Sequence, residues 1–190
     1  MTAFLTAFGL AGAAGLNAYV PLMAIAVLAR LGLVHLAPPF DLLASTWALV
    51  AIGVLLTVEV IVDKVPGADH VNDLVQTVVR PAAGALAFGA ATGAIADAPG
   101  WLTLAAGLVT AFSVHSVKAA ARPAVNASTL GLGAPVVSVL EDIVAVATSL
   151  IALLVPYLVA LVALGFVVLA FVLWRRRRRR RDRERAGARG

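Results

Sequence analysis

The chain has 190 residues, 62% of them apolar, and a mean hydropathy of +0.99. Soluble domains are only about half apolar, so this composition excludes an ordinary soluble domain and indicates one domain embedded in a bilayer. Residues 175–190 carry ten arginines and a net charge of +8, whereas residues 1–174 carry a net charge of −3. The absence of cysteine excludes disulfides and thiolate chemistry. We therefore expect a transmembrane domain over 1–174 and a basic, disordered cytoplasmic tail over 175–190.

Six apolar segments are candidate membrane-spanning helices. A bilayer core of about 30 Å needs roughly 20 residues of helix, and helix is the only single-segment structure that satisfies its own backbone in lipid. The candidates are about 3–30, 44–63, 81–97, 101–117, 134–154 and 156–174. Since 134–174 is too long for one crossing, we expect a tight hairpin near Pro156, with one long tilted helix as the alternative. The predicted fold class is an all-α, polytopic transmembrane bundle of about six spans.

Seven consecutive arginines after Trp174 predict the orientation. Basic residues accumulate on the cytoplasmic side, so we expect the tail in the cytoplasm, beneath an inner membrane. Six spans would place the N-terminus there too, together with loops at 64–80 and 118–133, which hold four of the five basic residues of the body. The bilayer and anionic headgroups at the arginines are the expected partners. We expect no nucleic acid, since no aromatic residues interleave with the arginines.

An internal repeat is suggested by rare residues. A shift of 54 residues places Trp47 on Trp101, Gly53 on Gly107, Lys64 on Lys118, Asn72 on Asn126 and Pro81 on Pro135. A tandem two-helix repeat is one interpretation and chance is the other, because few other positions match. Small residues spaced for close packing, such as Gly84, Gly89 and Gly93, also permit a homo-oligomer.

Ionisable residues at membrane depth are the candidate functional residues. Charge is costly there, so such residues usually face a bundle interior or a water-filled cavity. Helical spacing puts Glu59 with Asp63 on one face, and a second face carries His115, Lys118 and Arg122. We predict a substrate-binding site in the inner half of the bundle, made of Asn17, Glu59, Asp63, His115, Lys118, Arg122, Glu141 and Asp142.

The chemistry of this predicted site has two interpretations. The carboxylates suit a cation or a proton, while His115 and Lys118 suit an anion. Alternatively, Glu59 or Asp63 pairs with Lys118 or Arg122 and only fastens helices together, as buried ion pairs often do.

Two inner segments carry weaker signals. Asp63, Asp69, His70 and Asp73 have oxygen and imidazole ligands that suit divalent ions, but their spacing matches no specific metal motif. A solvated turn at Pro66-Gly67 is the other interpretation, and we assign no cofactor. The small residues over 118–133 suggest either a re-entrant segment or an ordinary cytoplasmic connection.

Several motifs together resemble a known family. They are Gly15-Leu16-Asn17-Ala18-Tyr19-Val20-Pro21, Asp63-Lys64-Val65-Pro66 with Asp69, Arg80-Pro81 with Gly84, then Lys118, Arg122 and Asn126, and finally Glu141-Asp142. Over roughly 5–155 the chain resembles the small bacterial membrane proteins filed as domain of unknown function 4126. This resemblance implies a polytopic membrane protein and no substrate, and it carries no assigned functional residues.

Three functions fit these observations. A small transporter or channel subunit would use the polar residues as a site within the bundle. A structural or assembly protein would use them as fasteners. A lipid-modifying enzyme would use His115 with Asp63 as acid–base groups, but no nucleophile motif supports it, so we expect no enzymatic activity.

Overall fold

A computed structural model describes residues 2–64, 68–93, 99–129 and 133–159, together with 161, 162, 164, 165, 168 and 175. Its elements are α1 (Thr2–Leu16), α2 (Tyr19–Arg30), the 3-10 helix η1 (Phe40–Ala44), α3 (Thr46–Val62), α4 (Ala68–Thr92), α5 (Gly100–Thr129) and α6 (Gly133–Leu154). Every regular element among the described residues is a helix, which confirms the predicted all-α fold.

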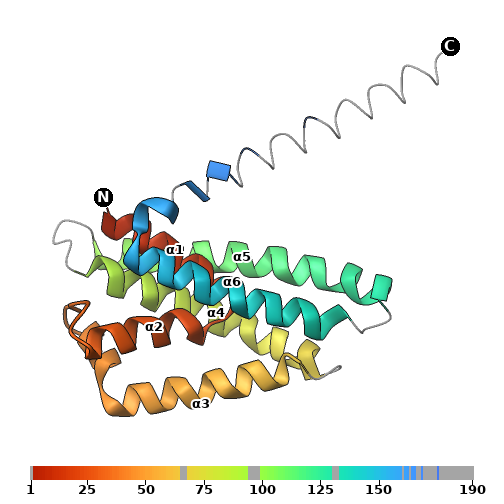
Figure 1. Cartoon of the computed structure of the whole chain (residues 1–190), viewed down its shortest axis with the longest axis horizontal. Helices are drawn as coiled ribbons and strands as arrows, with labels where there is room; N and C mark the ends of the chain where they lie inside the picture. Colours follow the sequence, from red (N-terminus) through yellow and green to blue (C-terminus); the bar gives the residue numbers. More distant parts are fainter. Residues whose placement is uncertain are drawn as a thin grey trace.

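The helices pack side by side into one bundle (Figure 1). Parts of α4, α5 and α6 are long and apolar enough to cross a bilayer, over Leu74–Thr92, Gly100–Ala121 and Pro135–Leu154. The bundle has two ends. We name the end where α2 finishes and α3 begins the Arg30 end, and the end where α3 finishes and α4 begins the Lys64 end. Figure 1 shows α3 and α5 running from the Arg30 end towards the Lys64 end, and α4 and α6 returning.

Residues 3–30 form a hairpin of two short helices instead of the single span expected. With 15 and 12 residues, α1 and α2 reach only about 22 Å and 18 Å, short of a core of about 30 Å. Thr6 donates to the carbonyl of Ala152 near the end of α6, whereas Asn17 donates to Asp142 in its first half. From this depth α2 returns beside α1 to the Arg30 end (Figure 1). We call this element the re-entrant hairpin and residues 16–18 its tip.

Local sequence explains the turn at the tip. The Asn17 side-chain oxygen accepts from the backbone amides of Tyr19 and Val20, both at 3.1 Å, and so caps the start of α2. Pro21 lies in the first turn of α2, where its missing amide proton costs no helical hydrogen bond. Hydropathy could not reveal this break, because both helices are apolar.

The hairpin changes the predicted topology. Because the chain returns to the Arg30 end, α1 begins at the end of the bundle opposite to Lys64 (Figure 1). The expectation that the N-terminus shares one side with the connections near 64 and 130 is therefore wrong.

The two expected inner loops are mostly helical. Helix α4 begins at Ala68 and α5 continues to Thr129, so Pro81 and Pro123 lie inside helices. A proline removes only one hydrogen bond, and packing against neighbouring helices offsets that loss. The re-entrant segment considered for 118–133 is thus helical as far as Thr129, and 130–132 lie outside the described residues. Arg80 and Lys118 consequently belong to the bundle and not to cytoplasmic loops.

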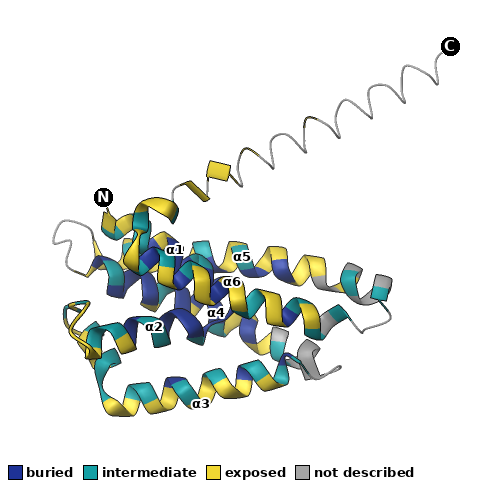
Figure 2. Cartoon of the chain, viewed as in Figure 1, coloured by how far each residue is buried: buried dark blue, intermediate teal, exposed yellow. Residues whose placement is uncertain are grey.

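Burial places the core around the hairpin. In Figure 2, α1 and the middle of α4 are largely buried, while α3 and α5 present exposed residues outward. Helices α4 and α5 approach closely because Gly84 and Gly107 have no side chains. A Cβ at Gly84 would clash with Ala111, and one at Gly107 would clash with Phe88. Small residues therefore serve packing within one chain.

The outer surface suits lipid. Trp47 and Trp101, in the first turns of α3 and α5, are 85% and 71% exposed at the Arg30 end. Exposed tryptophans at helix ends are typical of a membrane–water interface.

The proposed repeat agrees with the structure only at its start. Thr46 and Gly100, which begin α3 and α5, are equivalent under the 54-residue shift, and both helices run in the same direction. The likeness ends there, because α3 stops at Val62 while α5 continues to Thr129. The tandem repeat stays a prediction.

The helix is interrupted next to Pro156, near which we predicted a tight hairpin. Helix α6 ends at Leu154, Val155 is not helical, and residues 156–159 are helical again. Most of 160–174 and nearly all of the tail lie outside the described residues, so the tight hairpin near Pro156, the last span and the division at 174 stay predictions.

Candidate functional site

Charged residues from four helices meet beside the tip of the re-entrant hairpin. We define this ionic cluster as Glu59, Asp63, Lys64, Arg80, His115, Lys118, Glu141 and Asp142. Arg80 and Asp142 each lie 12 residues from the Arg30 end of their helices, which is about 18 Å at 1.5 Å per residue. The cluster therefore lies at membrane depth, in the half nearer the Lys64 end.

Arg80 is the centre of the cluster and is completely buried. Its Nη2 lies 3.1 Å from Oε1 of Glu59 and 3.5 Å from Oδ2 of Asp63, and its Nη1 lies 3.1 Å from Nδ1 of His115. Both carboxylates are buried too. One guanidinium thus joins α3, α4 and α5 where water cannot screen its charge.

The contacts of His115 define its tautomer. A guanidinium only donates, so Nδ1 of His115 must accept from Arg80. The ring proton then sits on Nε2, 3.1 Å from Oγ1 of Thr77, which accepts it. His115 is therefore neutral, and a second ring proton would place two donors face to face.

Lys118 connects the cluster to the hairpin. Its Nζ lies 2.9 Å from Oε2 of Glu141 and 3.5 Å from Oδ2 of Asp63. It also donates to the carbonyl of Leu16, at 3.0 Å. This carbonyl lies at the last turn of α1, where helical partners are lacking and the helix dipole favours a cation.

A second pair closes the cluster on the Lys64 side. Lys64 donates to Oδ2 of Asp142 at 2.8 Å, and Asn17 donates to Oδ1 of the same carboxylate at 2.9 Å. The Lys64 side chain is 30% exposed, in contrast to 2% for Lys118. The cluster is therefore closed at its centre and reaches the surface at Lys64.

The cluster carries an excess of negative charge. Four carboxylates face three cations and a neutral histidine, which gives a net charge of −1. Within the described part of the chain, Oε2 of Glu59 makes no hydrogen bond, nor do Oε1 of Gln76 and Oγ of Ser138, all of them buried. Within the cluster itself, one oxygen of the Glu59 carboxylate thus remains available as an acceptor.

The structure brings together most of the residues predicted for the site. They are Asn17, Glu59, Asp63, His115, Lys118, Glu141 and Asp142. The side chain of Arg122 lies outside the described residues. The predicted pair of Asp63 with Lys118 is present, but the partner of Glu59 is Arg80.

The predicted site did not include Lys64, Thr77 or, above all, Arg80, which contact its residues in the structure. Arg80 was assigned to a loop because Pro81 follows it. The available signal was the lone arginine within the apolar stretch that continues beyond Pro81.

The described residues do not test the predicted metal constellation of Asp63, Asp69, His70 and Asp73. The side chains of Asp69, His70 and Asp73 lie outside the described part of the chain. Asp63 contacts Arg80 and Lys118, and it also accepts from Asn72 at 2.7 Å. No group of three or more acidic or histidine residues suited to a metal occurs among the described residues.

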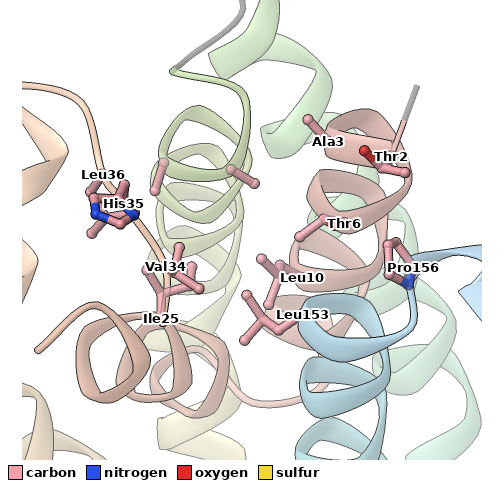
Figure 3. A pocket seen from close by; sticks show the side chains of 12 residues that line it. Thr2, Ala3, Thr6, Leu10, Ile25, Val34, His35, Leu36, Leu153 and Pro156 are labelled. Carbon is pink, nitrogen blue, oxygen red and sulfur yellow. The ribbon is translucent and has the colours of Figure 1, made fainter. Parts of the chain in front are cut away.

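A cavity of about 290 Å³ lies apart from the cluster, at the Arg30 end (Figure 3). Its walls come from the open side of the hairpin, from the loop after α2 and from the ends of α4 and α6, and include Thr2, Thr6, Ile25, His35 and Leu153. Leu10 of α1 also lines it, two turns before Asn17. The hairpin tip thus separates this cavity from the ionic cluster.

A re-entrant hairpin whose tip contacts buried charges defines a polytopic membrane protein with a polar interior. Residues 4–176 match the family model described as Domain of unknown function (DUF4126), and the chain belongs to this family. The family predicted from sequence is thereby confirmed, and the match extends beyond the expected limit near 155. No curated protein and no solved structure matches the chain.

Asn17→Ala tests the construction of the hairpin tip. It removes the cap of α2 and one donor to Asp142, so we expect the free energy of unfolding to fall by about 1–2 kcal/mol. Asn17→Asp keeps the cap but places a second carboxylate against Asp142, so it should also lower stability. Adding Asp142→Asn removes this repulsion and should restore part of the lost stability. Thermal unfolding in detergent, followed by tryptophan fluorescence, measures these differences. Equal stability of wild type and Asn17→Ala would contradict the assignment of the tip.

Proposed function

We propose that this protein is a small transporter or channel subunit for an ion or a small solute, with its binding site at the ionic cluster. The observation that carries the proposal is the meeting of the hairpin tip with buried charges at membrane depth. Irregular backbone at this depth is tolerated where it is enclosed by protein or lines a cavity. Discontinuous helices whose ends meet near the midplane are a recurrent construction of transporter sites.

Features at both ends of the bundle that lead towards the ionic cluster support this proposal. The cavity at the Arg30 end reaches Leu10 in the wall of the hairpin. On the other side, Lys64 is partly exposed and contacts Asp142. The tip, held by Asn17 and Lys118, lies between the two approaches. A movement of the hairpin would thus open the cluster to one end or the other.

The charge of the cluster favours a cationic substrate or coupling ion. All three cations already contact carboxylates, while the net charge is −1. An anion would have to break an existing ion pair, whereas a cation would offset the excess charge.

We further propose that the Lys64 end and the arginine-rich tail face the cytoplasm of a bacterial cell, where the tail contacts anionic lipids. The seven arginines from 175 to 181 support this orientation. The N-terminus would then lie outside. A homo-oligomer is part of the same proposal, since the exposed faces of α3 and α5 are apolar.

A flux assay on reconstituted protein tests the function. Liposomes that contain the protein and a pH-sensitive or ion-sensitive dye receive, in turn, gradients of H⁺, Na⁺, K⁺ and Cl⁻. We expect at least one of these ions to move several-fold faster than through empty liposomes, and Glu59→Gln to abolish most of the difference.

Asp41→Asn is the matched control for this assay. It also replaces a carboxylate by an amide, but Asp41 lies exposed in η1, far from the ionic cluster. Flux equal to that of empty liposomes for every ion, or an equal effect of the two variants, would refute the transport site.

The second candidate function is structural or assembly-related, and one observation favours it. Each of Lys64, Arg80 and Lys118 contacts a carboxylate on another helix, as helix-fastening pairs would. An enzymatic function has less support, since both ring nitrogens of His115 already contact Arg80 and Thr77. The double variant Glu59→Gln with Arg80→Gln separates the structural role from transport.

A further inference from the structure

Two buried oxygen atoms stand out because both can only accept hydrogen bonds. Oε2 of the Glu59 carboxylate and Oε1 of the Gln76 amide make no hydrogen bond within the described part of the chain. The two residues are 2% and 3% exposed. Buried acceptors are usually satisfied, and each one left without a donor is costly.

Helix register places Glu59 and Gln76 at the same level of the bundle. Helices α3 and α4 are antiparallel neighbours (Figure 1), and Asn72 donates to Asp63 across them at 2.7 Å. One turn back along α3 from Asp63 is Glu59, and one turn forward along α4 from Asn72 is Gln76. Positions four apart lie on one helix face, so Gln76 faces α3 at the height of Glu59.

The next turn of α4 supports this register. Arg80, four residues after Gln76, donates to Oε1 of Glu59 at 3.1 Å. Gln76 is therefore bracketed by two residues of the same face, Asn72 and Arg80, that both reach α3. The Glu59 carboxylate accepts from Arg80 through Oε1, and its Oε2 makes no hydrogen bond in the described part of the chain.

We propose that Glu59 and Gln76 form a proton-binding site. In this site Oε2 of Glu59 binds one proton, and the resulting hydroxyl donates a hydrogen bond to Oε1 of Gln76. The proton comes from water, the carboxylate becomes a neutral carboxylic acid, and no electrons are transferred. One proton satisfies both acceptors at once. The site deepens the proposed function, on which it rests, by making H⁺ the coupling ion.

The surroundings of Glu59 are compatible with a change of charge. The titratable groups facing it directly or through Arg80 are Tyr19 on α2, Asp63 on α3, Arg80 on α4, and His115 and Lys118 on α5. Uptake of one proton brings the net charge of the ionic cluster from −1 to zero. Arg80 also contacts Asp63, at 3.5 Å, so its charge has a second carboxylate partner besides Glu59.

Infrared difference spectroscopy of the purified protein in lipid tests the site. Spectra at high and low pH reveal the carbonyl stretch of a protonated carboxylic acid. We expect a band that is lost in Glu59→Gln and retained in the control Asp41→Asn. Gln76→Leu removes the acceptor, so the same band should move to a higher frequency.

The outcomes separate this site from the proposed function. A band that survives in Glu59→Gln, or that keeps its frequency in Gln76→Leu, overturns the site, even if the liposomes transport an ion. A Glu59 band in a protein that moves no ion supports the site and refutes transport. Stabilisation by Na⁺ in the wild type but not in Glu59→Gln, without such a band, would assign the oxygens to a metal cation and overturn the proposal.

Discussion

Replacing Arg80 with glutamine is expected to lower the free energy of unfolding by about 3–5 kcal/mol. Arg80 is fully buried and contacts Glu59, Asp63 and His115. Its removal deprives Glu59 of the cation that it contacts at membrane depth, and it deprives Asp63 of one of its cationic contacts. Thermal unfolding in detergent, together with the yield of monodisperse protein, measures the loss.

A matched control and a rescue accompany this variant. Arg30→Gln makes the same change at an exposed arginine whose Nη1 contacts only the carbonyl of Ala44 in the described structure, so it should change stability by less than about 1 kcal/mol. The double variant Glu59→Gln with Arg80→Gln removes both charges of the pair and should recover much of the stability. If Arg80→Gln behaves like Arg30→Gln, the cluster does not hold the bundle together.

Replacing Lys118 with methionine should also lower the free energy of unfolding by about 3–5 kcal/mol. Lys118 is buried and joins Glu141, Asp63 and the carbonyl of Leu16, so three groups on three helices lose their common cation. The hairpin should loosen with them. Limited proteolysis between α1 and α2 and thermal unfolding both report this change.

Lys64→Met provides the comparison for this second variant. Lys64 is 30% exposed, and its only ion pair in the described structure is with Asp142. Its replacement should therefore lower the free energy of unfolding by no more than about 1 kcal/mol. An equal effect of the two lysine variants would mean that burial at Lys118 has no energetic consequence, contrary to this account.

The sequence allowed much of the site to be predicted, for a physical reason. A charged residue inside an apolar helix is conspicuous because lipid cannot solvate it. Glu59, His115 and Glu141 were found in this way. The high apolar content likewise predicted the helical fold, because helix satisfies its own backbone in lipid.

Other features carried no local signal. Hydropathy over 3–30 is the same for one crossing and for a re-entrant hairpin, and only the cap at Asn17 distinguishes them. Arg80 was misplaced because proline usually marks a helix boundary, whereas Pro81 lies inside α4. The choice of Arg80 over Lys118 as the partner of Glu59 depends on the register of α3 against α4, which only tertiary packing determines.

Ion flux through liposomes that contain the double variant Glu59→Gln with Arg80→Gln tests the central claim most directly. The variant lacks one buried ion pair but should fold, so stability and transport become separate quantities. We predict that the folded double variant moves ions no faster than empty liposomes, while the wild type does so several-fold faster. Wild-type rates in the folded double variant would contradict a transport site at the ionic cluster and would leave its pairs a purely structural role.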